Sequence, residues 1–263
     1  FESNDTGKEY KMKKFFVLVG ISAFLLTTVA SANSQTDLIK AFVSFDQAFI
    51  PPLAITNQEK VKPSKKAMAI LNQNWSQFKA EYENYNPADP DWKKDFDYAD
   101  AQIKKANEIV NSGKDLMSAH ETLESVRIQF MELRQRNNID YYVDYLTEFH
   151  EYMEAIFHTG KDNPPESLTE DDIDDLKNHY EEAARVWQKI TTASFDKALY
   201  DFNDQKAGKM KSFMAKETDA LNRLKKAIGS KDNTKIVKAC MGIKPNYAKL
   251  YKLFGNFERV QKG

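Results

Sequence analysis

The sequence predicts an all-α protein, arranged as two tandem up-down four-helix bundles. Residues that break helices are sparse, with 9 Gly and 8 Pro in 263 residues, and the prolines are clustered. Apolar residues recur three and four positions apart over long segments, as on the buried face of an amphipathic helix. The order of these segments repeats once along the chain, which predicts two units of similar construction.

Four helices are expected in the first unit, which spans residues 33–137. They are separated by Pro51-Pro52, by the segment Asn86–Pro90 and by Ser112-Gly113. Proline lacks the N–H that continues a helix, and Gly adopts the left-handed conformation at which many helices end. The expected helices cover residues 37–50, 65–85, 91–111 and 115–135.

The second unit, residues 138–263, repeats this order. Its last helix is introduced by Ser230-Lys231-Asp232, much as the last helix of the first unit is introduced by Ser112-Gly113-Lys114-Asp115. The shared lead-in indicates a tandem duplication of a four-helix unit. The expected helices cover residues 139–157, 170–191, 194–228 with a break near Gly208, and 232–254 with a kink at Pro245.

The first 32 residues are predicted to be missing from the mature protein. Met12 is followed by two lysines, then an apolar run, Phe15–Leu26, and then the small residues Ala30-Ser31-Ala32. This basic, apolar and A-x-A order is typical of a secretory signal peptide. We expect cleavage after Ala32, a bacterial periplasmic location and no membrane attachment after cleavage. We interpret residues 1–11 as an over-extended gene start.

Charge and cysteine content exclude several classes of protein. The formal net charge is −1, with both signs interspersed along the chain, which argues against a nucleic-acid-binding protein. Cys240 is the only cysteine, so neither an intramolecular disulfide nor a cysteine zinc site can form. Because Cys240 lies on an apolar helical face, we expect a buried, unreactive thiol.

One pentapeptide, His-Glu-x-x-Glu, occurs twice, at His120–Glu124 and at His150–Glu154. Residues four apart share one face of a helix, so each His points the same way as its Glu. If the chain turns back at Asn137, the two imidazoles and two carboxylates meet. Such a set suits zinc, copper or iron, and the candidate metal ligands are therefore His120, Glu124, His150 and Glu154.

Two alternatives to this metal site stay open. His-Glu pairs on helices are common, and the four residues can instead be ordinary residues at the boundary between core and solvent. The helices on either side of Asn137 can also be one continuous helix. Two histidines thirty positions apart on such a helix would be about 45 Å from each other, at about 1.5 Å per residue.

The first half resembles the cytochrome b562 family of periplasmic four-helix bundles. The residues that carry the resemblance are Thr36-Asp37-Leu38, Phe96-Asp97, Gln102-Ile103, Ala106, Gly113-Lys114, Ala119, Leu123 and Arg127. The resemblance covers most of residues 36–135 and, more weakly, the second half. It implies the bundle fold and the compartment. That family holds haem through a Met in the first helix and a His late in the last, positions that fall here near Phe42 and Met131.

These observations predict a periplasmic, non-enzymatic helical-bundle protein that binds a ligand or a transition-metal ion. No Ser-His-Asp order, phosphate loop or dinucleotide fingerprint is supported by the spacing. The alternative is a haem-binding electron-transfer protein of the cytochrome b562 type, with non-family ligands such as Met131. A metalloenzyme at the two pentapeptides ranks last. A protein partner and the oligomeric state stay open.

Overall fold

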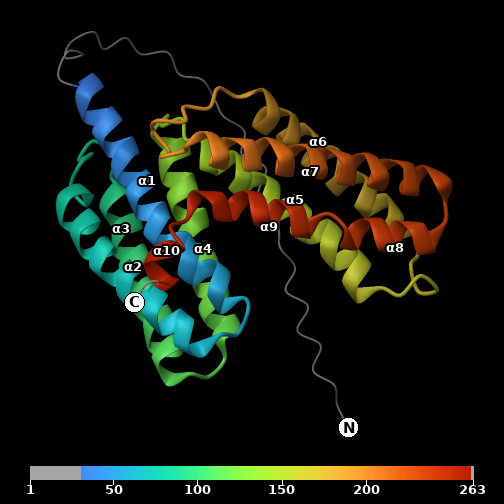
Figure 1. Cartoon of the computed structure of the whole chain (residues 1–263), viewed down its shortest axis with the longest axis horizontal. Coiled ribbons are helices and arrows are strands. Elements are labelled where there is room, and N and C mark those ends of the chain that lie inside the picture. The colour runs from blue at the N-terminus through green and yellow to red at the C-terminus, as the bar shows by residue number, and fades with distance from the viewer. Residues whose placement is uncertain (1–30, 262–263) are drawn as a thin grey trace.

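The computed structural model describes residues 31–261, and every regular element in this range is a helix (Figure 1). The predicted signal peptide, Met12–Ala32, and the extension before it lie outside the described residues, apart from Ser31 and Ala32. The prediction of an all-α protein is confirmed for this range. Buried residues from both halves form one continuous apolar core.

The first half contains α1 (Ser31–Thr56), α2 (Val61–Tyr82), α3 (Trp92–Ser112) and α4 (Leu116–Arg136). Each helix packs against the next, and α1 also contacts α4. Aromatic rings fill the space between them. The Phe45 ring lies 5.3 Å from the rings of both Phe78 and Phe130, measured between centroids. The Trp75 ring packs with them and donates its indole N–H to Asp100 at 2.9 Å, so its one polar group is satisfied.

The helices of the second half, and the short segments that end the chain, are α5 (Tyr142–Asp162), α6 (Glu170–Thr192), α7 (Asp204–Ser230), α8 (Asn233–Met241), α9 (Lys244–Tyr251), the 3-10 turn η1 (Lys252–Phe254) and α10 (Glu258–Gln261). Helix α5 packs against α6, α8 and α9, and α7 packs against the same three. Helices α5 and α8 approach closely at Gly160, where an added Cβ would lie 2.5 Å from Cys240 Cβ. Cys240 is fully buried, and burial raises the pKa of its thiol to about 12.

Several helix boundaries in the second half differ from expectation, and α5 extends to Asp162 instead of ending at residue 157. The helix predicted from residue 194 begins only at Asp204, because Asn203 caps it by accepting the Lys206 backbone N–H at 2.8 Å. It then runs through Gly208 without a break. The final helix is divided at Gly242-Ile243, just before the kink predicted at Pro245. Proline fits the first turn of α9, where its missing N–H would have no helical partner.

The prediction that the first helix stops at Pro51-Pro52 is wrong, since α1 continues to Thr56. A proline at position 51 leaves the carbonyl of residue 47 without its helical donor. In this structure the backbone N–H of Asn256 donates to Gln47 O at 2.8 Å and takes that place. The Thr56 hydroxyl donates to Pro52 O at 2.8 Å and closes the last turn. A distant segment thus makes the prolines tolerable inside the helix.

The alternative of one continuous helix through Asn137 is also wrong. Helix α4 ends at Arg136, and Asn138 has a positive φ of 54°. The backbone N–H of Ile139 then donates to Arg134 O at 2.9 Å, which fixes the turn into α5. In Figure 1, α5 leaves the end of α4 and runs across the molecule into the second half.

The end of the chain returns to the first half. There, η1 contacts α1, and α10 contacts α2 (Figure 1). Val260 packs in a small apolar cluster with Ile55 and Ala67. Within the described part of the chain, Gln35–Thr56 has the length and hydropathy of a membrane span. Most of that stretch is buried in the protein, and its apolar side chains form the core of the first half.

Candidate ligand site between the two halves

A cavity of about 230 Å³, the junction pocket, lies where α1, α4, α5 and α9 meet. Helices α1 and α4 belong to the first half, and α5 and α9 to the second, so neither half forms the pocket alone. All four predicted site residues line it. The further side chains on its wall include Leu53, Arg127, Met153, Lys244, Tyr247 and Tyr251.

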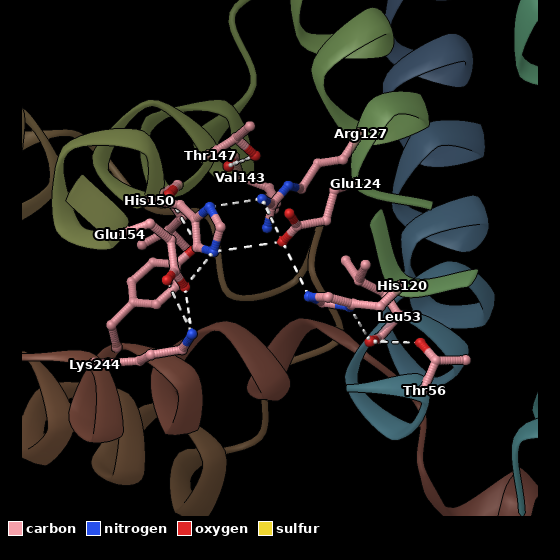
Figure 2. Close-up of polar contacts among 12 residues, drawn as sticks. Leu53, Thr56, His120, Glu124, Arg127, Val143, Thr147, His150, Glu154 and Lys244 are labelled. Carbon is pink, nitrogen blue, oxygen red and sulfur yellow. Dashed lines mark hydrogen bonds and ion pairs between the residues drawn. The ribbon is translucent and has the colours of Figure 1, made fainter. Parts of the chain in front are cut away.

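His120, on α4, is oriented by the end of α1 (Figure 2). Its Nδ1 lies 2.9 Å from Leu53 O, a carbonyl in the last turn of α1, where carbonyls lack helical partners. Its Nε2 lies 3.3 Å from Glu124 Oε1. Both ring nitrogens therefore face oxygen acceptors, and only an imidazolium donates to both. The continuation of α1 through Pro51-Pro52 is what brings Leu53 to this position.

Glu124 lies at the centre of the network. Its Oε1 is 3.3 Å from Arg127 Nη2 and 3.5 Å from His150 Nε2, in addition to the contact with His120. Burial raises the pKa of Glu124, but the hydrogen bond from His120 and the charge of Arg127 outweigh burial. The pKa therefore lies well below its usual value, and the carboxylate stays ionised.

His150, on α5, is held in one tautomer. Arg127 Nη2 lies 2.8 Å from His150 Nδ1 and can only donate, so Nδ1 is the unprotonated nitrogen. The proton then lies on Nε2, which donates to Glu154 Oε1 at 3.1 Å. Burial, followed by the charge of Arg127, lowers the pKa of His150. The ring is therefore neutral in this arrangement.

Glu154 connects α5 to α9. Lys244 Nζ lies 2.7 Å from Glu154 Oε1 and 2.9 Å from Oε2. Burial raises the pKa of Glu154, whereas the hydrogen bond from His150 and the contact with the charged Lys244 lower it, to about 2. Tyr247 completes this wall, with its ring 5.4 Å from that of His150 and its hydroxyl donating to Leu146 O at 3.0 Å.

The structure brings all four predicted residues into one network, which also includes the charged side chains of Arg127 and Lys244. Glu124 contacts both His120 and His150, whereas Glu154 contacts His150 and Lys244. No group of three or more His, Cys, Asp or Glu side chains with metal-binding geometry occurs in the described range, residues 31–261. Sequence reasoning missed Lys244, which no local pattern near Pro245 distinguishes, and it did not include Arg127 among the site residues.

The two positions of the family's haem ligands are packed within the first half. Phe42 has no donor atom, and its ring lies 5.1 Å from Phe78 and 5.7 Å from Phe130. Met131 is buried. This packing does not fit a haem at the family's position. No family model, no curated protein and no solved structure matches the chain.

Proposed function

We propose that this protein is a periplasmic, non-enzymatic binding protein, built as two tandem four-helix bundles of the cytochrome b562 type, and that the junction pocket holds its ligand. The observation that carries the proposal is a single cavity walled by α1 and α4 of one half and by α5 and α9 of the other. Small-molecule sites are common at such junctions, where helices of separate units cannot close the space completely.

The chemistry of the pocket supports binding rather than catalysis. The low pKa values keep Glu124 and Glu154 ionised, and Arg127 fixes the proton of His150. General acid–base catalysis needs a group that exchanges its proton near the working pH. These three groups are instead preorganised as a polar wall opposite the apolar and aromatic side chains of α1 and α9.

The test is native mass spectrometry of the full chain as isolated, with a variant that fills the pocket. Ala248→Trp places an indole at the half-buried Ala248, which lines the cavity, whereas Ala215→Trp adds the same group on the exposed face of α7. We expect a bound small molecule in the wild type and in Ala215→Trp, and none in Ala248→Trp. The same occupancy in both variants, or none in the wild type, contradicts the proposal.

A transition-metal ion is the second candidate for this site. Glu124 Oε1 lies 3.3 Å from His120 Nε2 and 3.5 Å from His150 Nε2, and His150 Nε2 lies 3.1 Å from Glu154 Oε1. Ligand atoms about 2.0–2.1 Å from a tetrahedral zinc ion lie about 3.3 Å from each other. His120 also contacts a carbonyl through Nδ1, a common arrangement for a metal-binding imidazole. Binding through His150 Nε2 requires Arg127 to withdraw from Nδ1.

Calorimetric titration with zinc(II) and copper(II) tests this candidate. Arg127→Ala removes both the donor to His150 and a repelling charge, so we expect metal affinity to rise at least tenfold. The double variant His120→Ala/His150→Ala should lose binding altogether. Metal affinity that is the same in the double variant, or that does not rise in Arg127→Ala, contradicts a metal site built from these residues.

A further inference from the structure

A second cavity, of about 410 Å³, lies where the end of the chain returns to the first half. We call it the C-terminal cavity. Its walls come from the end of α1, the start of α2, η1 and α10. The residues that line it are Ile55, Gln58, Lys60, Pro63, Lys252, Phe257, Val260 and Gln261.

The apolar wall of this cavity is held in place by contacts between distant segments. Ile55 and Val260 are buried in one small cluster, against which Phe257 packs. The hydrogen bond from Asn256 N–H to Gln47 O, 2.8 Å long, anchors the chain just before Phe257. The apolar wall of the cavity is therefore bounded by residues that contact distant parts of the chain.

The charged residues of the cavity are both basic. Lys60 and Lys252 line it, and no acidic residue does. Neither lysine forms an ion pair with any residue in the described range 31–261, whereas Lys244, in the junction pocket, is paired with Glu154. Burial and the charge of Lys60 lower the pKa of Lys252. Lys60 is exposed and Lys252 is half-buried, so both ammonium groups can contact one anion placed at the mouth of the cavity.

We propose that the C-terminal cavity binds one molecule of an amphipathic carboxylate, with its carboxylate at Lys60 and Lys252 and its hydrocarbon chain against Ile55, Phe257 and Val260. Charge complementarity favours an anion at the two lysines, and the apolar wall favours a hydrocarbon chain. The site is separate from the acidic network of the junction pocket, although Gln58 and Lys252 line both cavities.

Octanoate is the probe, titrated calorimetrically into the full chain alongside octanol and octylamine. We expect one octanoate per chain, with octanol at least tenfold weaker and octylamine without binding. Lys60→Gln should weaken octanoate at least tenfold, because Lys60 lines only this cavity. Lys62→Gln is the matched control, since Lys62 is an exposed lysine in the first turn of α2, two positions after Lys60, and does not line the cavity. It should bind octanoate like the wild type.

Three outcomes overturn the proposal: no octanoate binding, equal binding of octanol, or equal weakening by Lys60→Gln and Lys62→Gln. Flotation with phosphatidylglycerol vesicles distinguishes a free acid from a lipid surface. If the protein floats through Lys60 and Lys252 but binds no monomeric octanoate, the cavity is part of a lipid contact and the proposal is wrong. Circular dichroism of each variant shows whether the fold is retained.

Discussion

Two polar clusters lie between α4 and α5, and each contains an arginine and acidic side chains. They differ in how deeply these side chains are buried. In the buried cluster, Arg134 donates through Nε and Nη2 to Asp144, at 2.9 and 2.5 Å. Its guanidinium lies 4.5 Å from the ring centroids of Phe42 and of Tyr141. The Tyr141 hydroxyl donates to Asp46 at 2.7 Å, so the cluster also reaches α1. All of these residues are buried.

The network of the junction pocket is more open. The side chains of Glu124 and Glu154 are 25% and 22% exposed, against 3% for Arg134 and 7% for Asp144. Each of these two glutamates contacts more than one cation or imidazole. In the buried cluster one guanidinium neutralises the acidic groups. In the pocket network each glutamate has several partners, and the network borders a cavity. The first arrangement fixes α5 on α4, and the second leaves room for a ligand.

The largest expected effect comes from removing the guanidinium of each cluster. Arg134→Met leaves Asp144 and Asp46 buried without their main cation, and we expect a loss of about 3–5 kcal/mol in the free energy of unfolding. Arg127→Met leaves Glu124 with His120 and His150 as partners, so the expected loss is about 2 kcal/mol. Urea unfolding of both variants measures the difference.

A control for the Arg134 variant removes its charge partner as well. Arg134→Met/Asp144→Leu leaves no unpaired charge from the pair, so part of the lost stability should return. If Arg134→Met costs no more than Arg127→Met, the contrast between a single-cation cluster and a shared network is wrong.

The two clusters should also respond to pH with opposite signs. Burial raises the pKa of Asp46 to about 6, from 3.8. The folded state therefore binds a proton more tightly than the unfolded state does. The stabilisation that comes from this tighter proton binding is fully present below about pH 4 and is lost as pH rises through about 6. Asp46→Asn keeps an acceptor for Tyr141 and should be more stable than the wild type above pH 6, by about 2 kcal/mol.

Glu154 is the counterpart in the pocket network. Its pKa falls from 4.5 to about 2, so its contribution is present above about pH 4.5 and is lost as pH falls through about 2. Glu154→Gln should flatten the acid limb of the stability curve while leaving the limb between pH 5 and pH 7 as in the wild type. Urea unfolding midpoints of Asp46→Asn and Glu154→Gln, measured on the acid limb and between pH 5 and pH 7, check these two predictions. If the stability of both variants changes with pH in the same way, the prediction of opposite signs is wrong.

The helical fold could be predicted because its signals are local. Apolar spacing and the breakers at Asn86–Pro90 and Ser112-Gly113 determine most boundaries. The prediction failed at Pro51-Pro52, where Asn256, far along the chain, supplies the missing donor to Gln47 O. No rule about neighbouring residues includes that contact. The late start of α7 was also missed. The apolar spacing before Asn203 indicated a helix from residue 194, but the Asn203 side chain caps the helix and sets its first residue.

The candidate site could be predicted only in part, for the same reason. The repeated His-Glu-x-x-Glu pattern identified His120 and His150, since helical spacing joins each to its Glu. Lys244 is 90 positions from Glu154, and its importance follows only from where the divided final helix places α9. Whether the two pentapeptides meet depends on the turn after Asn137, and the sequence there contains neither Gly nor Pro to enforce it.

That turn gives the smallest predicted effect. Asn138 adopts φ of 54°, which Gly reaches without steric cost and Asn tolerates better than most residues. Asn138→Gly should change the free energy of unfolding by less than about 0.5 kcal/mol, and Asn138→Ala should cost about 1 kcal/mol. Gln135→Gly is the matched control, because Gln135 is an exposed residue within α4. There Gly should be destabilising by about 1 kcal/mol.

The order of the three variants in free energy of unfolding tests the turn itself, and not how well this region tolerates substitutions in general. A left-handed residue at position 138 requires Asn138→Gly to be the mildest change and Gln135→Gly to be costly. If α4 instead continued through Asn138, Ala would be the better residue at both positions, and Asn138→Gly would cost as much as Gln135→Gly. Because the Ile139–Arg134 hydrogen bond fixes the turn between α4 and α5, that result would also separate His150 from Glu124. Chemical denaturation of the three variants therefore tests the geometry on which the junction pocket depends.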